Sequence, residues 1–373
     1  MNIQIPPHIK YTRQLPETKA SLSNSCAESM SIGQLLKITH GSINSCKLHY
    51  ASVAGSQAFR ESVLTFHSAL NKGEHGLTPE HVVSFCGAQE ALAAIYKSVL
   101  LPGDEVIVTT PSYPSLVYMA KQIGCRVKQI QLKEAQQWRL SFSEVKKAIS
   151  EHTKLIVLNS PHNPCGSIID KTLRQEVLSL AKRYDCYLLS DDVSQASNYL
   201  GQDLSHDYLS YEKAISVSVM SKSFGLAGIR VGWVISRNEA LLDRLLAFKT
   251  QGSICTSIVD EQLASLALRY HDKIVERNNQ IIHSNYNAFQ QFVTEYAEFI
   301  SWCPPQAGIL SVAHIKTNAP IETWSFQLAK HFQVLVLPAC LFGLEGNYVR
   351  IGLGQLDFEP QLKKLANFFT TTT

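Results

Sequence analysis

Short apolar stretches alternate with amphipathic stretches from about residue 80 onward, and this alternation restricts the possible folds more than any other feature. The apolar stretches are rich in β-branched residues, whereas the segments between them repeat apolar residues with helical spacing. Such an order predicts an α/β fold with a mostly parallel sheet covered by helices on both faces. The expected strands are 81–85, 105–110, 126–132, 154–159, 186–190, 214–219 and 231–236, with helices at 88–100, 115–124 and 170–184.

The rest of the chain predicts an arm and a second, smaller domain. A long helical stretch at about 257–292 leads to strand candidates at 308–315, 334–338 and 348–354. Residues 1–40 look irregular, and the prolines at 6, 7 and 16 fit an extended arm. We therefore expect an N-terminal arm and small-domain segment at 1–45, a large domain at 46–275 and a C-terminal small α+β domain at 276–373.

The composition is that of an ordinary globular protein, with 17% charged residues and a net charge of +3. This balance gives no reason to expect nucleic acid or a membrane surface as a partner. No apolar run approaches a membrane span, and the first residues lack the apolar core of a signal peptide. The nine cysteines form no CxxC pair, and the histidines and cysteines show no zinc spacing, so we expect a cytoplasmic protein without a metal site.

Chemically distinctive residues follow the predicted strands at their carboxyl ends, where open α/β sheets bind ligands. Gly87-Ala88-Gln89 open a helix, a geometry that suits a phosphate but also any helix start. Tyr113, in PSYPS, is suited to stacking on a flat ring or to packing in the core. Asn163, in NSPHNPCG, projects an amide from a rigid loop, although a turn alone would also explain it.

Three charged residues complete this set. Asp191 ends a buried strand, where a carboxylate needs a cationic partner, either a ligand or a nearby arginine. Lys222 lies among small and apolar residues in SKSFGLAGIRVGW, with Arg230 eight positions on. A lone lysine or arginine is usually a solvated surface charge. Together, however, a lysine for an aldehyde, an acid for a ring nitrogen and a phosphate cradle are what pyridoxal phosphate (PLP) requires.

The order and spacing of these motifs resemble the class I/II aminotransferase family, which has the fold-type I architecture of PLP enzymes. The resemblance covers roughly residues 48–370 and rests on YASVAG, GAQEAL, LPGDEV, PSYPS, NSPHNPCG, SDDV, SKSFGLAGIRVGW and YVRIGLG. It implies a seven-stranded-type sheet, pyridoxal 5′-phosphate as the cofactor, and a homodimer with active sites at the subunit interface.

The resemblance also implies roles for individual residues. Lys222 would join the cofactor aldehyde and move protons, and Asp191 would hold the ring N–H. Asn163 would bond the ring oxygen O3′, and Tyr113 would stack on the ring. The expected phosphate-binding residues are Gly87, Ala88, Gln89, Ser221, Arg230 and, from the partner subunit, Tyr50.

On the substrate side, the resemblance implies that Arg350 binds the α-carboxylate through a bidentate contact, with Asn163 close by. The family's arm folds over the substrate, which makes the serine-rich segment 20–36 a source of contacts. Its candidates are Ser23, Ser25, Cys26 and Glu28. The alternative is a polar lead-in to a helix capped by Ser29 or Ser31.

Two positions depart from the family pattern. Ser194 stands where a tyrosine commonly bonds O3′, and Val219 stands where a serine or threonine often binds the phosphate. The serine-rich arm and the PSYPSL…IGC segment resemble the subgroup of capreomycidine synthase and the enduracididine-forming cyclases, and Ser194 adds to the reasons for considering it. We therefore hypothesise elimination and guanidine ring closure on a hydroxylated arginine, with Glu28 and Asp192 as candidate guanidinium partners.

Two other functions stay open from the sequence. The first is conventional transamination between an L-amino acid and a 2-oxo acid, which begins with the same removal of the Cα proton. The second is a non-enzymatic PLP-sensing module. Such regulators carry a DNA-binding segment ahead of this fold, whereas only about 40 irregular residues precede it here.

Overall fold

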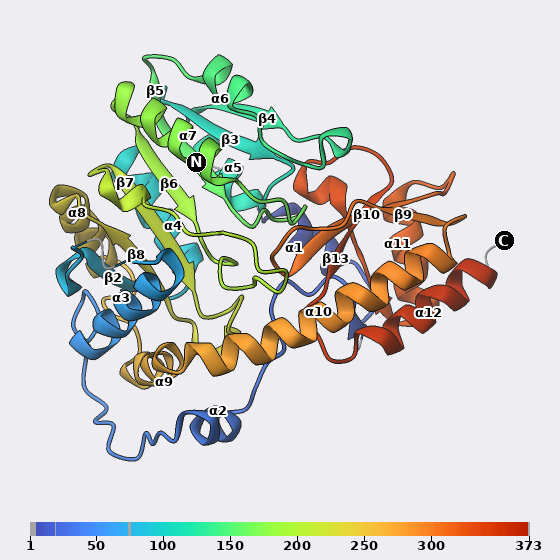
Figure 1. The fold of residues 1–373 in the computed structure, drawn as a ribbon, viewed down its shortest axis with the longest axis horizontal. Coiled ribbons are helices and arrows are strands. Elements are labelled where there is room, and N and C mark those ends of the chain that lie inside the picture. Colours follow the sequence, from blue (N-terminus) through green and yellow to red (C-terminus); the bar gives the residue numbers. More distant parts are fainter. Residues whose placement is uncertain (1–4, 19, 74–75, 372–373) are drawn as a thin grey trace.

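The computed structural model describes residues 5–18, 20–73 and 76–371, and its main sheet has seven strands in the order β2-β8-β7-β6-β5-β3-β4 (Figure 1). Strands β3 to β7 run parallel, whereas β8 is antiparallel to both β7 and β2. The predicted mostly parallel sheet is confirmed. Its strands are β2 (Val82–Phe85), β3 (Glu105–Thr110), β4 (Arg126–Gln131), β5 (Thr153–Asn159), β6 (Tyr187–Asp191), β7 (Ala214–Val219) and β8 (Gly232–Ser236).

Helices cover both faces of this sheet, which explains why its central strands are apolar throughout. Along β5, Leu155 and Val157 pack in one core cluster with α4, α5 and α8, whereas Ile156 and Leu158 pack in the other with α3, α7 and α9. This alternation follows from the two-residue period of a strand. The helices are α3 (Gln57–Asn71), α4 (Ala88–Val99), α5 (Pro114–Ile123), α6 (Phe142–Ala148), α7 (Lys171–Arg183), α8 (Glu239–Thr250) and α9 (Ile258–Arg269).

A separate core lies in the C-terminal part, beyond the long helix α10 (His271–Glu295), which is orange in Figure 1. Its four-stranded antiparallel sheet has the order β12-β13-β10-β9, and β1 pairs with β11 beside it. The elements are β1 (Ala20–Ser21), β9 (Ile300–Trp302), β10 (Leu310–Ile315), α11 (Ile321–Phe332), β11 (Val334–Leu335), β12 (Leu337–Pro338), β13 (Tyr348–Gly352) and α12 (Phe358–Thr371).

The helical stretch expected at 257–292 is in fact two helices, because Tyr270 ends α9 and precedes α10. The expected domain boundary at 275/276 falls inside α10, and the division into domains stays a prediction. Ile274 packs in the core of the large sheet, whereas Ile282 packs with the C-terminal core.

The N-terminal arm is more ordered than the sequence predicts. The prediction of an extended arm is wrong for residues 7–12, which form the helix α1 (Pro7–Thr12). Proline fits the first turn of a helix because the backbone N–H that it lacks has no partner there. Helix α2 (Ile32–Thr39) is capped by Ser31, whose hydroxyl accepts a hydrogen bond from the backbone N–H of Gln34.

The arm also lies directly against the C-terminal sheet. A Cβ added to Gly352 would overlap the backbone carbonyl of Asn24, and one added to Gly354 would overlap that of Cys26. Glycine therefore lets the arm approach β13 closely.

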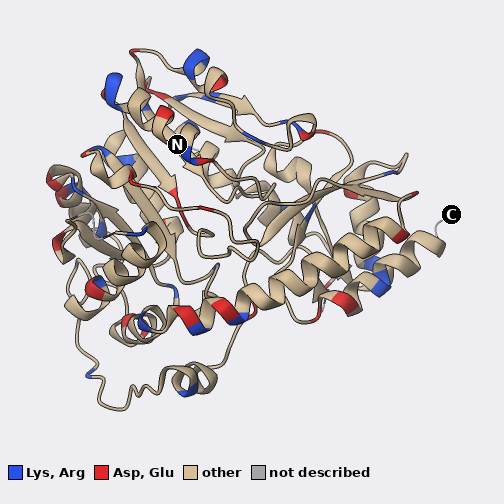
Figure 2. Cartoon of the chain, in the orientation of Figure 1, with Lys and Arg blue, Asp and Glu red and all other residues tan. Residues whose placement is uncertain are grey.

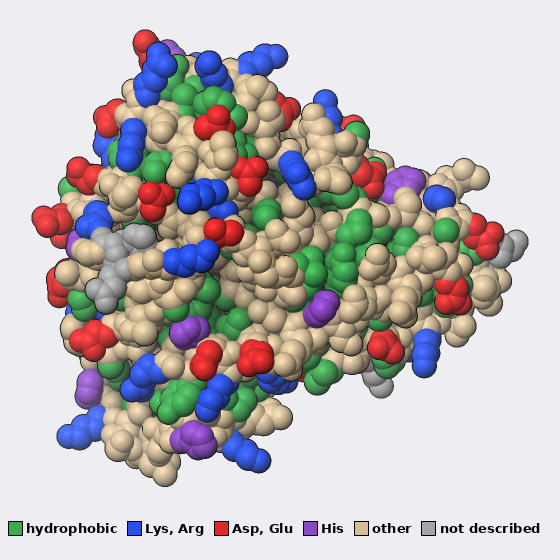
Figure 3. Space-filling model, in the orientation of Figure 1, with side chains coloured by type: hydrophobic (Ala, Val, Ile, Leu, Met, Phe, Trp, Pro, Cys, Tyr) green, Lys and Arg blue, Asp and Glu red, His purple; other side chains and the backbone are tan. Residues whose placement is uncertain are grey.

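Charges of both signs are interspersed over the outer helices and the visible face (Figures 2 and 3). Within the described residues, none of the helices has the length and apolar character needed to span a membrane.

Candidate active site

The carboxyl edge of the main sheet gathers the predicted site residues. The loops after β2, β3, β5, β6 and β7 all leave from this edge. Strand β8 is antiparallel and so begins there, which places Arg230, two residues before it, beside the others. A cavity of about 230 Å³ lies at this edge, lined by Cys26, Ala88, Gln89, Leu92, Tyr113, Asn159, Asn163, Asp191, Val193, Val219, Ser221, Lys222, Ala227 and Arg230.

Lys222 is held by the arm rather than by an acid. Its Nζ donates a hydrogen bond to Ser25 Oγ at 2.7 Å, and its carbonyl accepts one from the N–H of Ala27 at 3.0 Å. Burial lowers the pKa of the Lys222 ammonium, and the Arg350 guanidinium lowers it further. The amine is thus shifted toward the neutral form that attacks a carbonyl carbon.

Asp191 is a buried carboxylate at the end of β6. It accepts a hydrogen bond from the N–H of Val193 at 3.4 Å, and among the described residues it forms no ion pair with a lysine or arginine. Burial raises its pKa to about 7, and the neighbouring charge of Asp192 adds to the increase. A protonated ring nitrogen would supply the cation that the protein does not.

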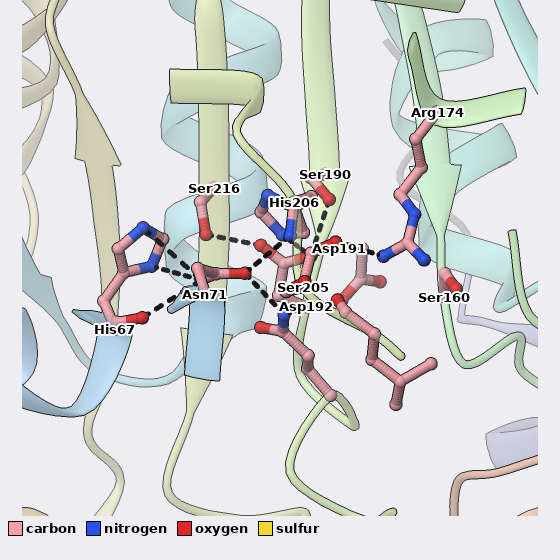
Figure 4. Close-up of polar contacts among 12 residues, drawn as sticks. His67, Asn71, Ser160, Arg174, Ser190, Asp191, Asp192, Ser205, His206 and Ser216 are labelled. Carbon is pink, nitrogen blue, oxygen red and sulfur yellow. Dashed lines mark hydrogen bonds and ion pairs between the residues drawn. The ribbon is translucent and has the colours of Figure 1, made fainter. Parts of the chain in front are cut away.

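Asp192 points away from the cavity, so its predicted contact with a substrate guanidinium is wrong. Its carboxylate accepts hydrogen bonds from Ser190 at 2.6 Å and Ser216 at 2.5 Å, and lies 3.2 Å from His206 Nε2 (Figure 4). Burial alone would raise the pKa of Asp192, but His206 and the two hydroxyls hold it below its usual value. Successive strand residues face opposite sides, which separates the two acids.

Asn163 and Asn159 form the wall after β5. The N–H of Asn163 donates to Asn159 Oδ1 at 2.6 Å, and the Asn159 amide donates to the carbonyl of Asp191 at 3.1 Å. The Oδ1 of Asn163 is buried without a hydrogen-bond partner among the described residues. The sequence analysis missed Asn159, although it begins the quoted motif NSPHNPCG.

The start of α4 forms the expected phosphate side. Gly87 has φ of +87°, and a Cβ there would lie 2.6 Å from Arg230 Nη2, so only glycine lets the guanidinium approach this turn. Arg230 donates to Ser221 Oγ at 3.3 Å. Gln89 accepts a bond from the Tyr113 hydroxyl at 3.3 Å, which connects the helix start to the ring-stacking candidate.

Arg350 lies on β13 and is buried, but not all of its N–H groups have a hydrogen-bond acceptor among the described residues. Its Nη2 donates to the carbonyl of Ser23 at 2.9 Å, and its guanidinium carbon lies 4.4 Å from the centre of the Phe342 ring. Its Nε has no hydrogen-bond partner among the described residues, and burial lowers its pKa to about 10. Ser23 therefore positions Arg350, since its hydroxyl also bonds the Arg350 carbonyl and accepts from the N–H of Leu337.

The structure divides the remaining candidates. Cys26 lines the cavity, and Ser25 contacts the lining residue Lys222. Glu28 is not among the described lining residues, and its carboxylate accepts a hydrogen bond from the N–H of Leu356 at 2.9 Å; its contact with the substrate stays a prediction. Tyr50 is 81% exposed and does not line the cavity of its own chain. Ser194 is also outside the lining, where Val193 and Val219 stand instead.

The residues present fit PLP. A buried carboxylate without a cation, an amide oxygen without a partner and a lysine of lowered pKa lie around one cavity, beside a helix start and an arginine. When bound, PLP supplies a ring that withdraws electrons from the α-carbon of an amino acid. Asp191 would hold the ring nitrogen, Lys222 the aldehyde carbon, and Arg230 with the start of α4 the phosphate.

Asp191 should make the cofactor-free protein less stable as the pH rises. Between its unfolded value of 3.8 and about 7 the folded protein keeps a proton that the unfolded chain releases, so stability falls across this range. At about 1.4 kcal/mol per pKa unit, the loss is roughly 4 kcal/mol. Asp191→Asn removes this titration. In urea unfolding, the free energy of unfolding of the variant minus that of the unmodified protein should therefore increase from pH 4 to pH 7.5.

Asp192→Asn is the matched control, with the opposite sign. The lowered pKa of Asp192 stabilises the fold above the unfolded value, and this contribution disappears as the pH falls through the folded value. The variant should be less stable than the unmodified protein at neutral pH, with the difference shrinking toward pH 3. Parallel curves for the two variants would contradict this assignment of the two acids.

Two known proteins are similar to this chain in sequence. Capreomycidine synthase of Streptomyces vinaceus is 28% identical over 279 residues, which are 74% of this chain and 70% of that protein. Arginine–pyruvate transaminase AruH of Pseudomonas aeruginosa is 32% identical over 189 residues, or 50% of this chain and 48% of that protein.

Two solved structures share the fold of this chain over its whole length. A PLP-dependent aminotransferase from Streptococcus suis has a TM-score of 0.91 at 26% identity, covering 100% of this chain and 99% of that one. The PLP-dependent cyclase OrfR has a TM-score of 0.90 with the same coverage, but at 19% identity it shows the shared fold alone. The model of the family "Aminotransferase class I and II" matches residues 36–367. The chain therefore belongs to the class I and II aminotransferase family of PLP-dependent enzymes.

Proposed function

We propose that this enzyme is a cyclodehydratase that acts on an L-amino acid with a hydroxylated guanidino side chain. The Cα proton passes to Lys222, and the side-chain hydroxyl takes up a proton and leaves as water. A guanidine nitrogen then bonds the carbon that lost the hydroxyl and releases a proton, and Cα takes a proton back, so that the net change is the loss of one water. The observation that carries the first step is the position of Lys222 and Asp191 in one cavity, with the buried donors of Arg350 nearby.

The chain's own residues have separable tasks in this proposal. Arg350 binds the α-carboxylate through donors that its contacts with Ser23 and Phe342 leave unused. Lys222, of lowered pKa and hydrogen-bonded to Ser25, exchanges the proton at Cα. Tyr113 and the apolar wall at Val193 and Val219 exclude water from the reacting face.

The departures from the usual aminotransferase site support elimination over transamination. Val193 and Val219 line the cavity, and the serine that replaces the family's tyrosine lies outside the lining, so the cofactor would lack two hydroxyl partners. The similarity to capreomycidine synthase and to an arginine–pyruvate transaminase supports a guanidino side chain.

Conventional transamination is the second candidate function. It is favoured by the likeness of the whole chain to the Streptococcus suis aminotransferase at 26% identity. Transamination needs the same Cα proton transfer by Lys222, and it differs in where the proton returns.

Product analysis separates the two functions. Incubation of the holoenzyme with arginine, with 3-hydroxyarginine and with common amino acids should give loss of one water, and a cyclic product, from the hydroxyarginine alone. Mass spectrometry measures both outcomes in one experiment. The opposite outcome is stoichiometric keto acid from arginine or common amino acids, with matching conversion of the cofactor to its amino form. That result would reject the cyclodehydratase and support the transaminase.

The covalent role of Lys222 has a control within the same chain. After borohydride reduction of the holoenzyme, peptide mapping should find the cofactor on the Lys222 peptide. Lys249 is a fully buried lysine whose pKa is also lowered, but it donates to the carbonyl of Val53 at 2.6 Å, outside the cavity lining. Label on Lys249, or equal label in Lys222→Ala, would refute the assignment.

A homodimer is the assembly that we propose, with Tyr50 of each subunit reaching the phosphate of the other. Tyr50 and Leu48 are 81% and 84% exposed in the single chain, and Tyr50 is not among the described residues that line the cavity of its own chain. Tyr50→Phe should weaken cofactor binding about tenfold, the usual effect of losing one hydrogen bond to a charged group.

Mixed dimers test this sharing directly. Lys222→Ala and Tyr50→Phe chains, mixed and reassociated, should regain one complete site per dimer, seen as a fraction of tightly bound cofactor absent from either variant alone. If the mixture binds only as much cofactor as the two variants bind separately, or if sedimentation gives the mass of a monomer, the shared site is contradicted.

A further inference from the structure

Helix α1 brings a residue to the site that the sequence analysis did not single out. The helix lies between the main sheet and the C-terminal sheet, near β10 and β13 (Figure 1), and it packs on the 3₁₀ turn at Ala339–Phe342. The Tyr11 hydroxyl anchors it by donating to the carbonyl of Glu322 at 3.0 Å. The arm is thereby fixed above the residues that bind the substrate, and His8 is on this helix.

The imidazole of His8, which is itself outside the cavity lining, contacts Tyr113 of that lining and Phe342 beside it. Its ring stacks on Phe342, with centroids 5.8 Å apart and planes 24° from parallel, and its centroid lies 5.9 Å from that of Tyr113. The Phe342 ring is the one that the Arg350 guanidinium also covers. His8 therefore contacts the expected cofactor-stacking residue directly, and it shares the Phe342 ring with the arginine that would bind the α-carboxylate.

The Nδ1 of His8 is buried and has no hydrogen-bond partner among the described residues. Burial lowers its pKa to about 4, and the positive charges of Arg350 and Lys222 add to the decrease. The ring is therefore neutral at pH 7. With its proton on Nε2, the Nδ1 lone pair is a hydrogen-bond acceptor without a donor.

Carboxylates are scarce around the cavity. Of the described residues that line the cavity, Asp191 is the one carboxylate, and the expected cofactor nitrogen requires it. Asp192 and Glu28, the two acids predicted for a guanidinium, bond Ser190, Ser216 and the N–H of Leu356. Apart from the amide oxygen of Asn163, which is expected beside the cofactor ring, a substrate side chain that carries N–H or O–H groups therefore needs an acceptor that the described lining residues do not supply.

We propose that His8 Nδ1 accepts a hydrogen bond from an N–H or O–H group of the substrate side chain, and so selects polar side chains over apolar ones of similar length. This inference deepens the proposed function and takes its guanidino substrate from it. It makes His8 a specificity residue contributed by α1, because a buried acceptor left unpaired disfavours a substrate that cannot donate.

The experiment must separate the contribution of the Nδ1 hydrogen bond to substrate binding from that of the packing of the His8 ring on Phe342. His8→Phe keeps a ring on Phe342 and removes the acceptor, whereas His8→Asn keeps an acceptor near the position of Nδ1 and removes the ring. Lys10→Ala changes an exposed residue of the same helix and serves as the matched control. The probes are α-methylarginine and α-methylnorleucine, which lack the Cα proton and therefore bind without reacting.

Calorimetric titration of the holoenzyme gives the dissociation constants. His8→Phe should weaken α-methylarginine binding about tenfold while leaving α-methylnorleucine unchanged or tighter, and His8→Asn should retain part of the preference. Lys10→Ala should leave both constants unchanged. Equal weakening of both probes by His8→Phe would show a packing role and overturn the proposal, as would no effect on either.

Two outcomes keep this inference distinct from the proposed function. A preference for α-methylarginine that depends on His8, in an enzyme that makes only keto acid, would uphold the contact and reject the cyclisation. Water loss from hydroxyarginine with no effect of His8 would do the reverse. If His8→Phe does not fold, judged by circular dichroism, His8→Leu gives the same comparison.

Discussion

A carboxylate without a cation of its own, buried at the end of β6, is the feature on which this active site depends. Leaving such a group buried is unfavourable, and folding tolerates it here because Asp191 can take a proton when no ligand is bound. The stored unfavourable free energy becomes binding free energy when a cationic ring nitrogen arrives. The site is thus prepared for its cofactor by burial, and the surrounding chain must prevent any internal cation from neutralising the acid.

The adjacent acid shows how the chain achieves this. Asp192 takes His206 and two serine hydroxyls as partners on the other side of the strand, while His206 itself stacks on Tyr208 at 4.5 Å. The Gln195 amide donates to Asn71 and to the carbonyl of Leu204, which fixes the loop that carries His206. A network of polar contacts therefore lies directly behind a carboxylate without a cation, and it holds the strand end without supplying a cation to the cavity.

Much of this site was predictable from the sequence, because a parallel sheet brings its carboxyl ends together whatever the loop lengths. That rule is enough to gather Tyr113, Asn163, Asp191 and Lys222 at one cavity. It cannot say on which side of the strand each of two successive acids lies, so Asp192 was predicted wrongly. Nor can it place the arm, whose contacts with β13 and Lys222 join residues more than 190 positions apart in the chain. His8 gave no local signal, since its neighbours Phe342 and Tyr113 come from distant segments.

The distribution of charge bears on which substrate the site can accept. Lys222, Arg230 and Arg350 bring positive charge to this region, while Asp191 alone among the described lining residues brings negative charge. A substrate α-carboxylate and the cofactor phosphate would neutralise the two arginines, and the cofactor aldehyde would take the charge of the lysine. Only then can the site accept a cationic side chain. The neutral imidazole of His8 is a better acceptor for such a side chain than a carboxylate would be, because a carboxylate would pair with Arg350 or Lys222 in the empty site. An acceptor without charge thus reconciles a basic pocket with a basic substrate.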